Sequence, residues 1–272
     1  MKTLTMKSIT HKILPSLAAG ILFTLASPSW AAGYVASLVD DFDINTNSAA
    51  STWSYSVGVP GSNYLLPINT KTVSDIFSPP AWASAQQVWA DNSPSWAYWM
   101  IGKNTTGATI TGPIWGDTLN WQPDTIMLYP GNPTQSQNLL VSWLAPSDMM
   151  VDLSWTYTQL AERGPGREAF GSFGTVYRVT HRSSTGDTTL VDFGAVAGPN
   201  GILGDTVSSS LSGLSVMAGD RLFWETKGFN STADCDATGA AIVIAESIPE
   251  PATTALLALG CGIAVLQRRR KC

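Results

Sequence analysis

Acidic side chains gather at two places where the sequence has the composition of turns. Asp40, Asp41 and Asp43 lie near one end of the central region, and Asp234 and Asp236 lie near the other. Carboxylate oxygens are ligands that Ca²⁺ prefers, so the five acids are candidates to hold a structural calcium ion if the fold joins these ends. We predict no other cofactor. Solvated turn carboxylates are the alternative, and the polar residues around them favour it.

Tryptophan is in excess, with eleven in 272 residues. Trp82, Trp89 and Trp96 lie in stretches rich in Pro, Ser and Asn, where a large ring is hard to bury. Flat aromatic rings are suited to stacking against the C–H faces of sugars. These three are candidate ligand contacts, and packing beneath long loops is the alternative that their setting favours. Trp143 and Trp155 lie in regular apolar patterns and are expected in the core.

Few residues are suited to catalysis. After the first thirty residues there is one histidine, His181, next to Arg182 at the end of an expected strand, where a surface position is expected. A Ser-His-Asp triad needs that ring buried and oriented by a carboxylate. Glu162 and Glu168 lie beside Gly, Pro and Arg, not in the apolar setting that a glycosidase acid requires. We predict that the protein is not an enzyme.

The formal net charge of −5 conceals an uneven distribution. Seven of the fifteen basic residues lie in the two terminal segments, so the region between them has eight against nineteen acids, a net charge near −11. This balance argues against nucleic acid and anionic lipid as its partners. Arg163, Arg167, Arg178 and Arg182 are expected to be solvated hairpin charges, with contact to an anionic polysaccharide as the alternative.

The cysteines do not form a structural framework. Cys235 stands alone in the central region, while Cys261 and Cys272 belong to the terminal segment. An internal disulfide is therefore not expected, and no spacing of Cys and His suggests zinc. The domain must rely on its hydrophobic core.

Short strands are the elements that must position these residues. Residues 151–157 alternate apolar and polar with period two, as a half-buried strand does. Similar runs occupy 53–59, 96–101, 139–144, 175–181, 188–193, 206–211, 221–226 and 240–245. Turn formers separate them and no amphipathic helical pattern occurs. We predict an all-β fold, an antiparallel β-sandwich over 32–247. Its first part, 32–120, would carry long loops, with a separate small domain as the alternative.

Residues 1–31 have the pattern of a secretory signal peptide. Lys2, Lys7 and Lys12 precede an apolar run, and small residues at 29 and 31 suit cleavage after Ala31. A retained transmembrane anchor is the alternative, which the short apolar run and the small residues disfavour.

The terminal segment, residues 248–272, has three parts in order. Pro249-Glu250-Pro251 comes first, and its prolines prevent a helix from continuing back into the central region. The apolar run 252–266 follows, and at about 1.5 Å per residue it spans roughly 22 Å, less than a hydrocarbon core of ~30 Å. Four cations close the segment, Arg268, Arg269, Arg270 and Lys271. Such a cluster is typical of a stop-transfer signal that stays on the cytoplasmic side of the membrane.

This order resembles the PEP-CTERM sorting signal, which is recognised by exosortase, a membrane-embedded, transpeptidase-like cysteine protease of Gram-negative bacteria. The resemblance covers residues 248–271. It implies that Pro249, Glu250 and Pro251 form the recognition motif and that the apolar run is a transmembrane helix in the inner membrane until cleavage. It also implies export to the cell surface or extracellular matrix, in bacteria that form biofilms and produce exopolysaccharide.

Residues 120–246 are similar to jelly-roll domains related to carbohydrate-binding modules. The likeness rests on the order of Pro130-Gly131, Trp143-Leu144-Ala145-Pro146, Ala218-Gly219-Asp220 and the acidic loop 233–239. Such modules hold a structural ion near their first and last strands, which would suit the calcium candidates. Cys235, inside the acidic loop, departs from the pattern.

Together these features predict an exported, non-catalytic protein of the cell envelope or extracellular matrix. It would be sorted by exosortase and would bind extracellular polysaccharide. A purely structural biofilm-matrix component without a specific ligand is the first alternative. An extracellular enzyme acting on glycans is the second.

Overall fold

A computed structural model of the protein describes residues 33–65, 88–91, 99–114, 117–130, 138–162, 175–196, 203–228 and 237–247. Within these ranges the chain forms sixteen β-strands and no helix. Every strand pair is antiparallel, so the predicted all-β, antiparallel fold is confirmed. The expected signal peptide and sorting helix lie outside the described residues.

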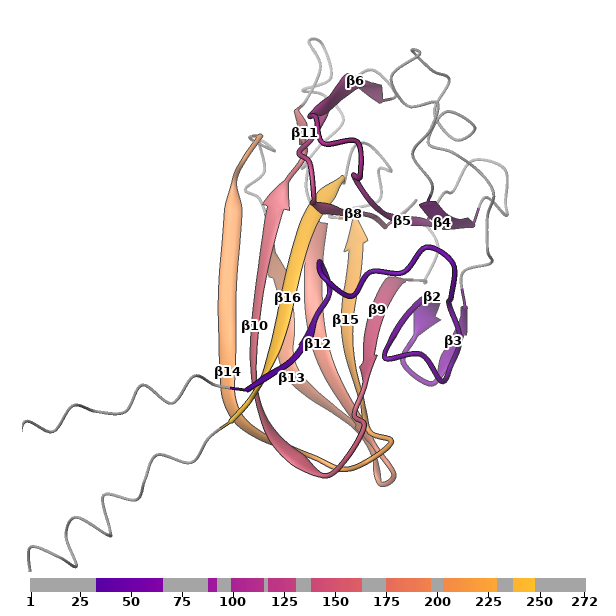
Figure 1. The fold of residues 1–272 in the computed structure, drawn as a ribbon, viewed down its shortest axis with the longest axis vertical. Coiled ribbons are helices and arrows are strands. Elements are labelled where there is room, and N and C mark those ends of the chain that lie inside the picture. Colours follow the sequence, from indigo (N-terminus) through magenta and orange to yellow (C-terminus); the bar gives the residue numbers. More distant parts are fainter. Residues whose placement is uncertain are drawn as a thin grey trace, which may run out of the picture. The chain divides into compact units, whose positions relative to one another are not determined.

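Two large sheets form the sandwich (Figure 1). The seven-stranded sheet has the order β14 (Thr206–Val216), β10 (Met149–Gln159), β16 (Thr238–Glu246), β8 (Ile126–Tyr129), β5 (Trp99–Lys103) and β4 (Val88–Asp91), with β1 (Tyr34–Ser37) paired to β16. The six-stranded sheet has the order β13 (Gly186–Ala195), β12 (Thr175–Ser183), β15 (Arg221–Gly228), β9 (Asn138–Leu144), β2 (Trp53–Val59) and β3 (Ser62–Leu65). The first half of the chain thus contributes strands to both sheets.

Strand β10 shows how the sequence pattern produces the sandwich. Val151, Leu153, Trp155 and Tyr157 are buried, and the polar residues between them are exposed or half-buried. Successive side chains of a strand point to opposite faces, so period-two alternation directs one face to the core. The predicted strand at 151–157 is therefore confirmed, within an element that is longer at both ends.

Aromatic side chains join the two sheets. The ring of Tyr177 on β12 lies 6.3 Å from that of Trp155 and 4.9 Å from that of Tyr157, both on β10. On the six-stranded sheet, Trp53 and Trp224 lie 6.0 Å apart between ring centroids. Such pairs add about 0.5–1.5 kcal/mol to the free energy gained from the burial of each ring.

A smaller sheet covers one end of the seven-stranded sheet. It contains β11 (Ala161–Glu162), β7 (Asp117–Trp121) and β6 (Ile110–Ile114). Leu119 and Trp121 of this sheet belong to a second core cluster with Met127 and Tyr129 of β8. Ile126 and Leu128, the other two residues of β8, belong to the main core, so both faces of this strand are buried. This double burial explains the continuous apolar run of β8.

Trp89 corrects one prediction from the sequence. It lies on β4, has no exposed surface, and donates a hydrogen bond from Nε1 to the carbonyl of Asp43 at 3.0 Å. Its ring centroid lies 6.5 Å from that of Tyr55 in the main core. A fully buried indole cannot stack on a sugar, so of the two interpretations of Trp89 packing in the core holds and ligand contact does not. The Ser- and Pro-rich sequence around Trp89 is typical of loops, so the short buried strand β4 was not predicted.

The substitution Trp89→Ala should therefore destabilise the fold. Loss of a buried indole is expected to lower the free energy of unfolding by about 3–5 kcal/mol. Val59→Ala is the control, because Val59 is 38% exposed and should change that free energy by no more than about 0.5 kcal/mol. Chemical denaturation of the full chain measures both. Equal stability of the two variants would contradict the core position of Trp89.

Candidate functional site

The side of the six-stranded sheet that faces away from the main core is unusually polar. Cross-strand pairing places Thr180 beside Phe223, Phe223 beside Ser142, and Ser142 beside Ser54. Their neighbours along the strands point into the main core, so this row lies on the opposite side. We call this side of β12, β15, β9 and β2 the polar face.

A buried ion pair lies at the centre of the polar face. The Glu225 side chain has no exposed surface and accepts hydrogen bonds from Arg178 Nε at 2.8 Å and Arg178 Nη2 at 2.6 Å. Thr180 Oγ1 and Asn138 Nδ2 donate to the same carboxylate at 2.7 and 3.1 Å. The hydrogen bond to Glu225 raises the pKa of Arg178. Arg178 is therefore a structural cation, not the solvated hairpin charge expected from the sequence.

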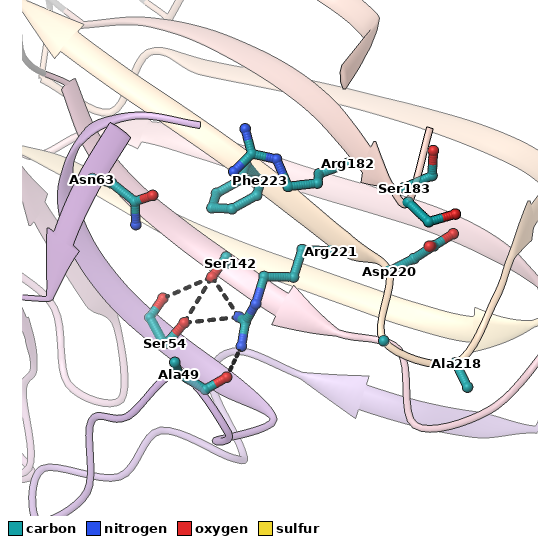
Figure 2. A pocket seen from close by; sticks show the side chains of 12 residues that line it. Ala49, Ser54, Asn63, Ser142, Arg182, Ser183, Ala218, Asp220, Arg221 and Phe223 are labelled. Carbon is teal, nitrogen blue, oxygen red and sulfur yellow. Dashed lines mark hydrogen bonds between the residues drawn. The ribbon is translucent and has the colours of Figure 1, made fainter. Parts of the chain in front are cut away.

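A cavity of about 580 Å³ opens at one end of the polar face (Figure 2). Ser54 of β2, Ser142 of β9 and Arg221 of β15 line one side. Arg182 and Ser183, at the end of β12, line another. Asn63 of β3 adds an amide, so hydroxyl, amide and guanidinium groups converge on a single space from five strands.

Arg221 organises one wall of this cavity. Its Nη1 donates to Ser54 Oγ and Ser142 Oγ at 3.0 Å each, and its Nη2 donates to the carbonyl of Ala49 (Figure 2). The two hydroxyl oxygens lie 2.7 Å apart. Within the described residues Arg221 makes no ion pair, and burial lowers its pKa. It is therefore a cation held by neutral oxygen atoms.

The hairpin that joins β12 to β13 provides the opposite wall. Arg182 binds Asp187 through Nε and Nη2, both at 2.7 Å. Its guanidinium carbon lies 5.6 Å from the ring centroid of Phe223, and Figure 2 shows these two side chains together. The Asp187 hydrogen bond raises the pKa of Arg182, and the Arg182 hydrogen bond lowers that of Asp187. Both side chains are about one-third exposed, as expected for hairpin charges.

His181 is less exposed than the sequence suggested. Its Nε2 lies 2.8 Å from Asp220 Oδ2, and the two side chains are only 14% and 7% exposed. The ring is therefore only partly exposed, because Asp220, just before the neighbouring strand β15, holds it. Asp220 Oδ2 also accepts a hydrogen bond from Met217 N at 3.0 Å. Within the described part of the chain, no hydroxyl is bonded to Nδ1 of His181, so the triad arrangement is incomplete there.

The acids proposed as calcium ligands are only partly described. Asp41 and Asp43 line a second cavity, of about 480 Å³, which Asp40 does not line. Asp41 Oδ2 accepts hydrogen bonds from Ser37 N and Trp53 Nε1, at 2.8 and 3.3 Å. A hydrogen bond from the backbone of Asn45 lowers the pKa of Asp43.

No three His, Cys, Asp or Glu side chains are grouped to bind a metal ion within the described ranges. Asp234 and Asp236 lie outside those ranges, so the calcium site stays a prediction. The same holds for Trp82 and Trp96 and for the sorting residues Pro249, Glu250, Pro251, Arg268, Arg269 and Arg270. Within the described ranges, no helix is long and apolar enough to cross a membrane.

The residues that line the cavity were mostly missed from the sequence. Ser54 and Ser142 are 88 positions apart, and Arg221 lies 167 positions from Ser54. Only strand register brings them together, and single-strand patterns do not show register. On β2 and β9 the usable signal was a serine between two apolar core residues, and on β15 Arg221 follows Asp220 and has no such signal.

Residues 247–271 match the family described as the PEP-CTERM protein-sorting motif. The chain thus carries the sorting signal of an exported protein, which indicates sorting by exosortase. No match was found among curated proteins.

Several solved structures share limited similarity with the chain. A GH26-CBM35 β-(1,4)-mannanase of Podospora anserina is 11% identical, with 56% of this chain and 28% of that chain covered and a TM-score of 0.28. This chain therefore matches little more than a quarter of the mannanase. TmCBM61, in complex with β-1,4-galactotriose, is 10% identical over 60% and 79%, with a TM-score of 0.24. A family 29 carbohydrate-binding module is 12% identical over 56% and 95%, with a TM-score of 0.28. Similarity at this level does not identify a ligand of this chain.

The Arg178–Glu225 pair supports a prediction about stability. Arg178→Met leaves a buried carboxylate without its cation and should lower the free energy of unfolding by about 3–5 kcal/mol. Arg178→Met combined with Glu225→Leu removes both charges and should restore most of that loss. Arg182→Met, which breaks an exposed pair, should cost no more than about 1 kcal/mol. Chemical denaturation measures the free energy of unfolding of all three variants. Equal decreases in this free energy for Arg178→Met and Arg182→Met would contradict the role of the buried pair.

Proposed function

We propose that this chain is an exported, non-catalytic protein that binds extracellular polysaccharide at the cavity of the polar face. The observation that carries this proposal is the convergence of Ser54, Ser142, Arg182 and Arg221 on one cavity. Sugars present many hydroxyl groups, each of which can donate and accept hydrogen bonds. The hydroxyls of Ser183 and Ser184, which also line the cavity, can do both, and guanidinium groups add donors, while the nearly buried Ser54 and Ser142 hold Arg221 in place.

The size and the position of the cavity also support a saccharide ligand. Its volume of about 580 Å³ lies within the usual range for small-ligand sites, roughly 300–1,000 Å³. Its walls belong to paired strands of one sheet, which hold polar groups in fixed positions. Because every described tryptophan is buried, this proposal rests on hydrogen bonding and not on the aromatic stacking expected from the sequence.

A non-catalytic role is part of the proposal. Asp220 is the one carboxylate among the residues lining the cavity, and its Oδ2 is already bonded to His181 and to the backbone. A glycosidase of the common kind requires two carboxyl groups on either side of the scissile bond. The cavity therefore favours binding over hydrolysis.

Sorting precedes binding in this proposal. The precursor is anchored in the inner membrane by the apolar run 252–266, and exosortase then cleaves near Pro249-Glu250-Pro251. The last described sheet contact is the hydrogen bond from Ser247 N to the carbonyl of Met150, at 2.8 Å. Cleavage beyond this contact would leave β16 fully paired, so the released protein at the cell surface or in the matrix keeps its fold. A structural matrix component without a ligand is the competing function.

Binding is tested by blocking the cavity. Ala218 lines it and is exposed, whereas its neighbour Met217 is 59% exposed and does not line it. Ala218→Trp should weaken polysaccharide binding at least about tenfold, since an indole would fill the ligand's space, while Met217→Trp should leave affinity unchanged. A glycan array that includes the source bacterium's exopolysaccharide, probed with the full chain in detergent, measures both. Absence of binding to every glycan would favour the structural role.

Processing is tested at the end of the chain. Mass spectrometry of the protein recovered from the cell surface should show a new C-terminus near Pro249-Glu250-Pro251. Glu250→Ala should retain the tail, because the recognition motif is altered. Mature surface protein that still carries Arg268, Arg269 and Arg270 would contradict exosortase processing.

A further inference from the structure

We propose that the cavity is specific for an acidic sugar and that Arg221 binds its carboxylate. This inference rests on the proposed polysaccharide-binding function and adds the class of ligand. It arises from a difference among the arginines of the described residues, which are Arg178, Arg182 and Arg221.

Two of these arginines bind a carboxylate in the same way. Arg178 uses Nε and Nη2 to hold both oxygens of Glu225, and Arg182 uses the same two nitrogens to hold both oxygens of Asp187. This edge of a guanidinium matches a carboxylate with two parallel hydrogen bonds, which gives the pair both strength and geometric specificity.

Arg221 has the same edge without a carboxylate. A guanidinium has five N–H donors, and Arg221 uses two on Nη1 and one on Nη2. Within the part of the chain that the structure describes, its Nε–H and its second Nη2–H have no partner. Arg221 also lines the cavity, so a ligand in that space can reach these two donors.

The charges around Arg221 favour an anionic ligand. Arg182, the other cation of the cavity, is already paired with Asp187. The carboxylate of Asp220 is held by His181 and Met217 N, not by Arg221. Burial without an ion partner lowers the pKa of Arg221, and a bound carboxylate would compensate for the water that this cation has lost. The cavity thus contains a cation, Arg221, that makes no ion pair with the described residues, although the carboxylate of Asp220 also lines the cavity.

The other lining groups favour a sugar over an acidic peptide. Asn63 and Ser184 provide an exposed amide and an exposed hydroxyl suited to ring hydroxyls, while the nearly buried Ser54 and Ser142 hold Arg221 in place. Phe223 is only 2% exposed beneath Arg182, so it offers little apolar surface to a peptide side chain. A hexuronate unit, which carries one carboxylate among several hydroxyls, matches this combination.

The test compares ligands that differ only in their carboxylate. Calorimetry of the full chain in detergent would use hexuronate oligosaccharides and the same oligosaccharides after reduction of the carboxyl groups to alcohols. Reduction should weaken binding about 10- to 100-fold, the usual range for loss of a hydrogen bond to a charged group. Because the change is made in the ligand, this arm does not depend on a variant that folds.

Variants of Arg221 then locate the effect. Arg221→Gln should bind the acidic and reduced oligosaccharides equally, and Arg221→Lys should restore only part of the preference because lysine lacks the paired donors. Arg182→Gln is the matched control, since it removes a cation that is already paired, and it should keep a clear preference for the acidic form. Thermal unfolding of each variant confirms that it is folded.

The outcomes separate this inference from the proposed function. Equal binding of acidic and reduced oligosaccharides by the unmodified chain would overturn the acidic specificity and leave polysaccharide binding intact. No binding of any oligosaccharide or polysaccharide would overturn both. Tighter binding of a polyglutamate peptide than of every hexuronate would replace the sugar by an acidic peptide and also overturn the inference.

Discussion

The burial of large aromatic rings between the two sheets is the interaction on which the rest of this structure depends. Cys235 is the only cysteine between residues 32 and 247, so no disulfide within this region can support the fold. Trp143, Trp155 and Trp224 belong to one cluster and are almost fully buried. Removing such side chains from water contributes about 1.5–3 kcal/mol for each large apolar residue, and many are needed to offset the lost chain entropy.

The same burial determines the polar face. Because side chains alternate along a strand, directing Trp143 and Trp224 into the core turns Ser142 and Glu225 to the other side. The buried Glu225 carboxylate then requires partners, and Arg178 supplies them from the adjacent strand. Arg221 lies on that side too, where serine hydroxyls hold it. The proposed binding groups are thus positioned by residues that stabilise the fold.

The sorting motif and the proposed binding cavity lie in separate parts of the chain. The PEP-CTERM match begins at residue 247, immediately after β16 ends at Glu246. The end of β16 pairs with β10 on one side and with β1 on the other, so it is held on both sides while the motif lies just beyond. This separation allows removal of the tail without loss of a strand. The function proposed for the cavity is therefore compatible with processing at the motif.

The sequence by itself determined most of the longer strands, the fold class and the sorting signal, but not several short strands, such as β4 with Trp89. The predicted run 53–59 coincides with β2, and 139–144 differs from β9 by one residue, since alternation and turn formers are local properties. Tertiary structure decided which residues meet. Trp89 proved to be core, and Arg221 came to lie against Ser54 and Ser142, because register and sheet packing depend on residues far apart in the chain. Local patterns show which face of a strand is buried, but only the pairing of strands shows what lies on the other.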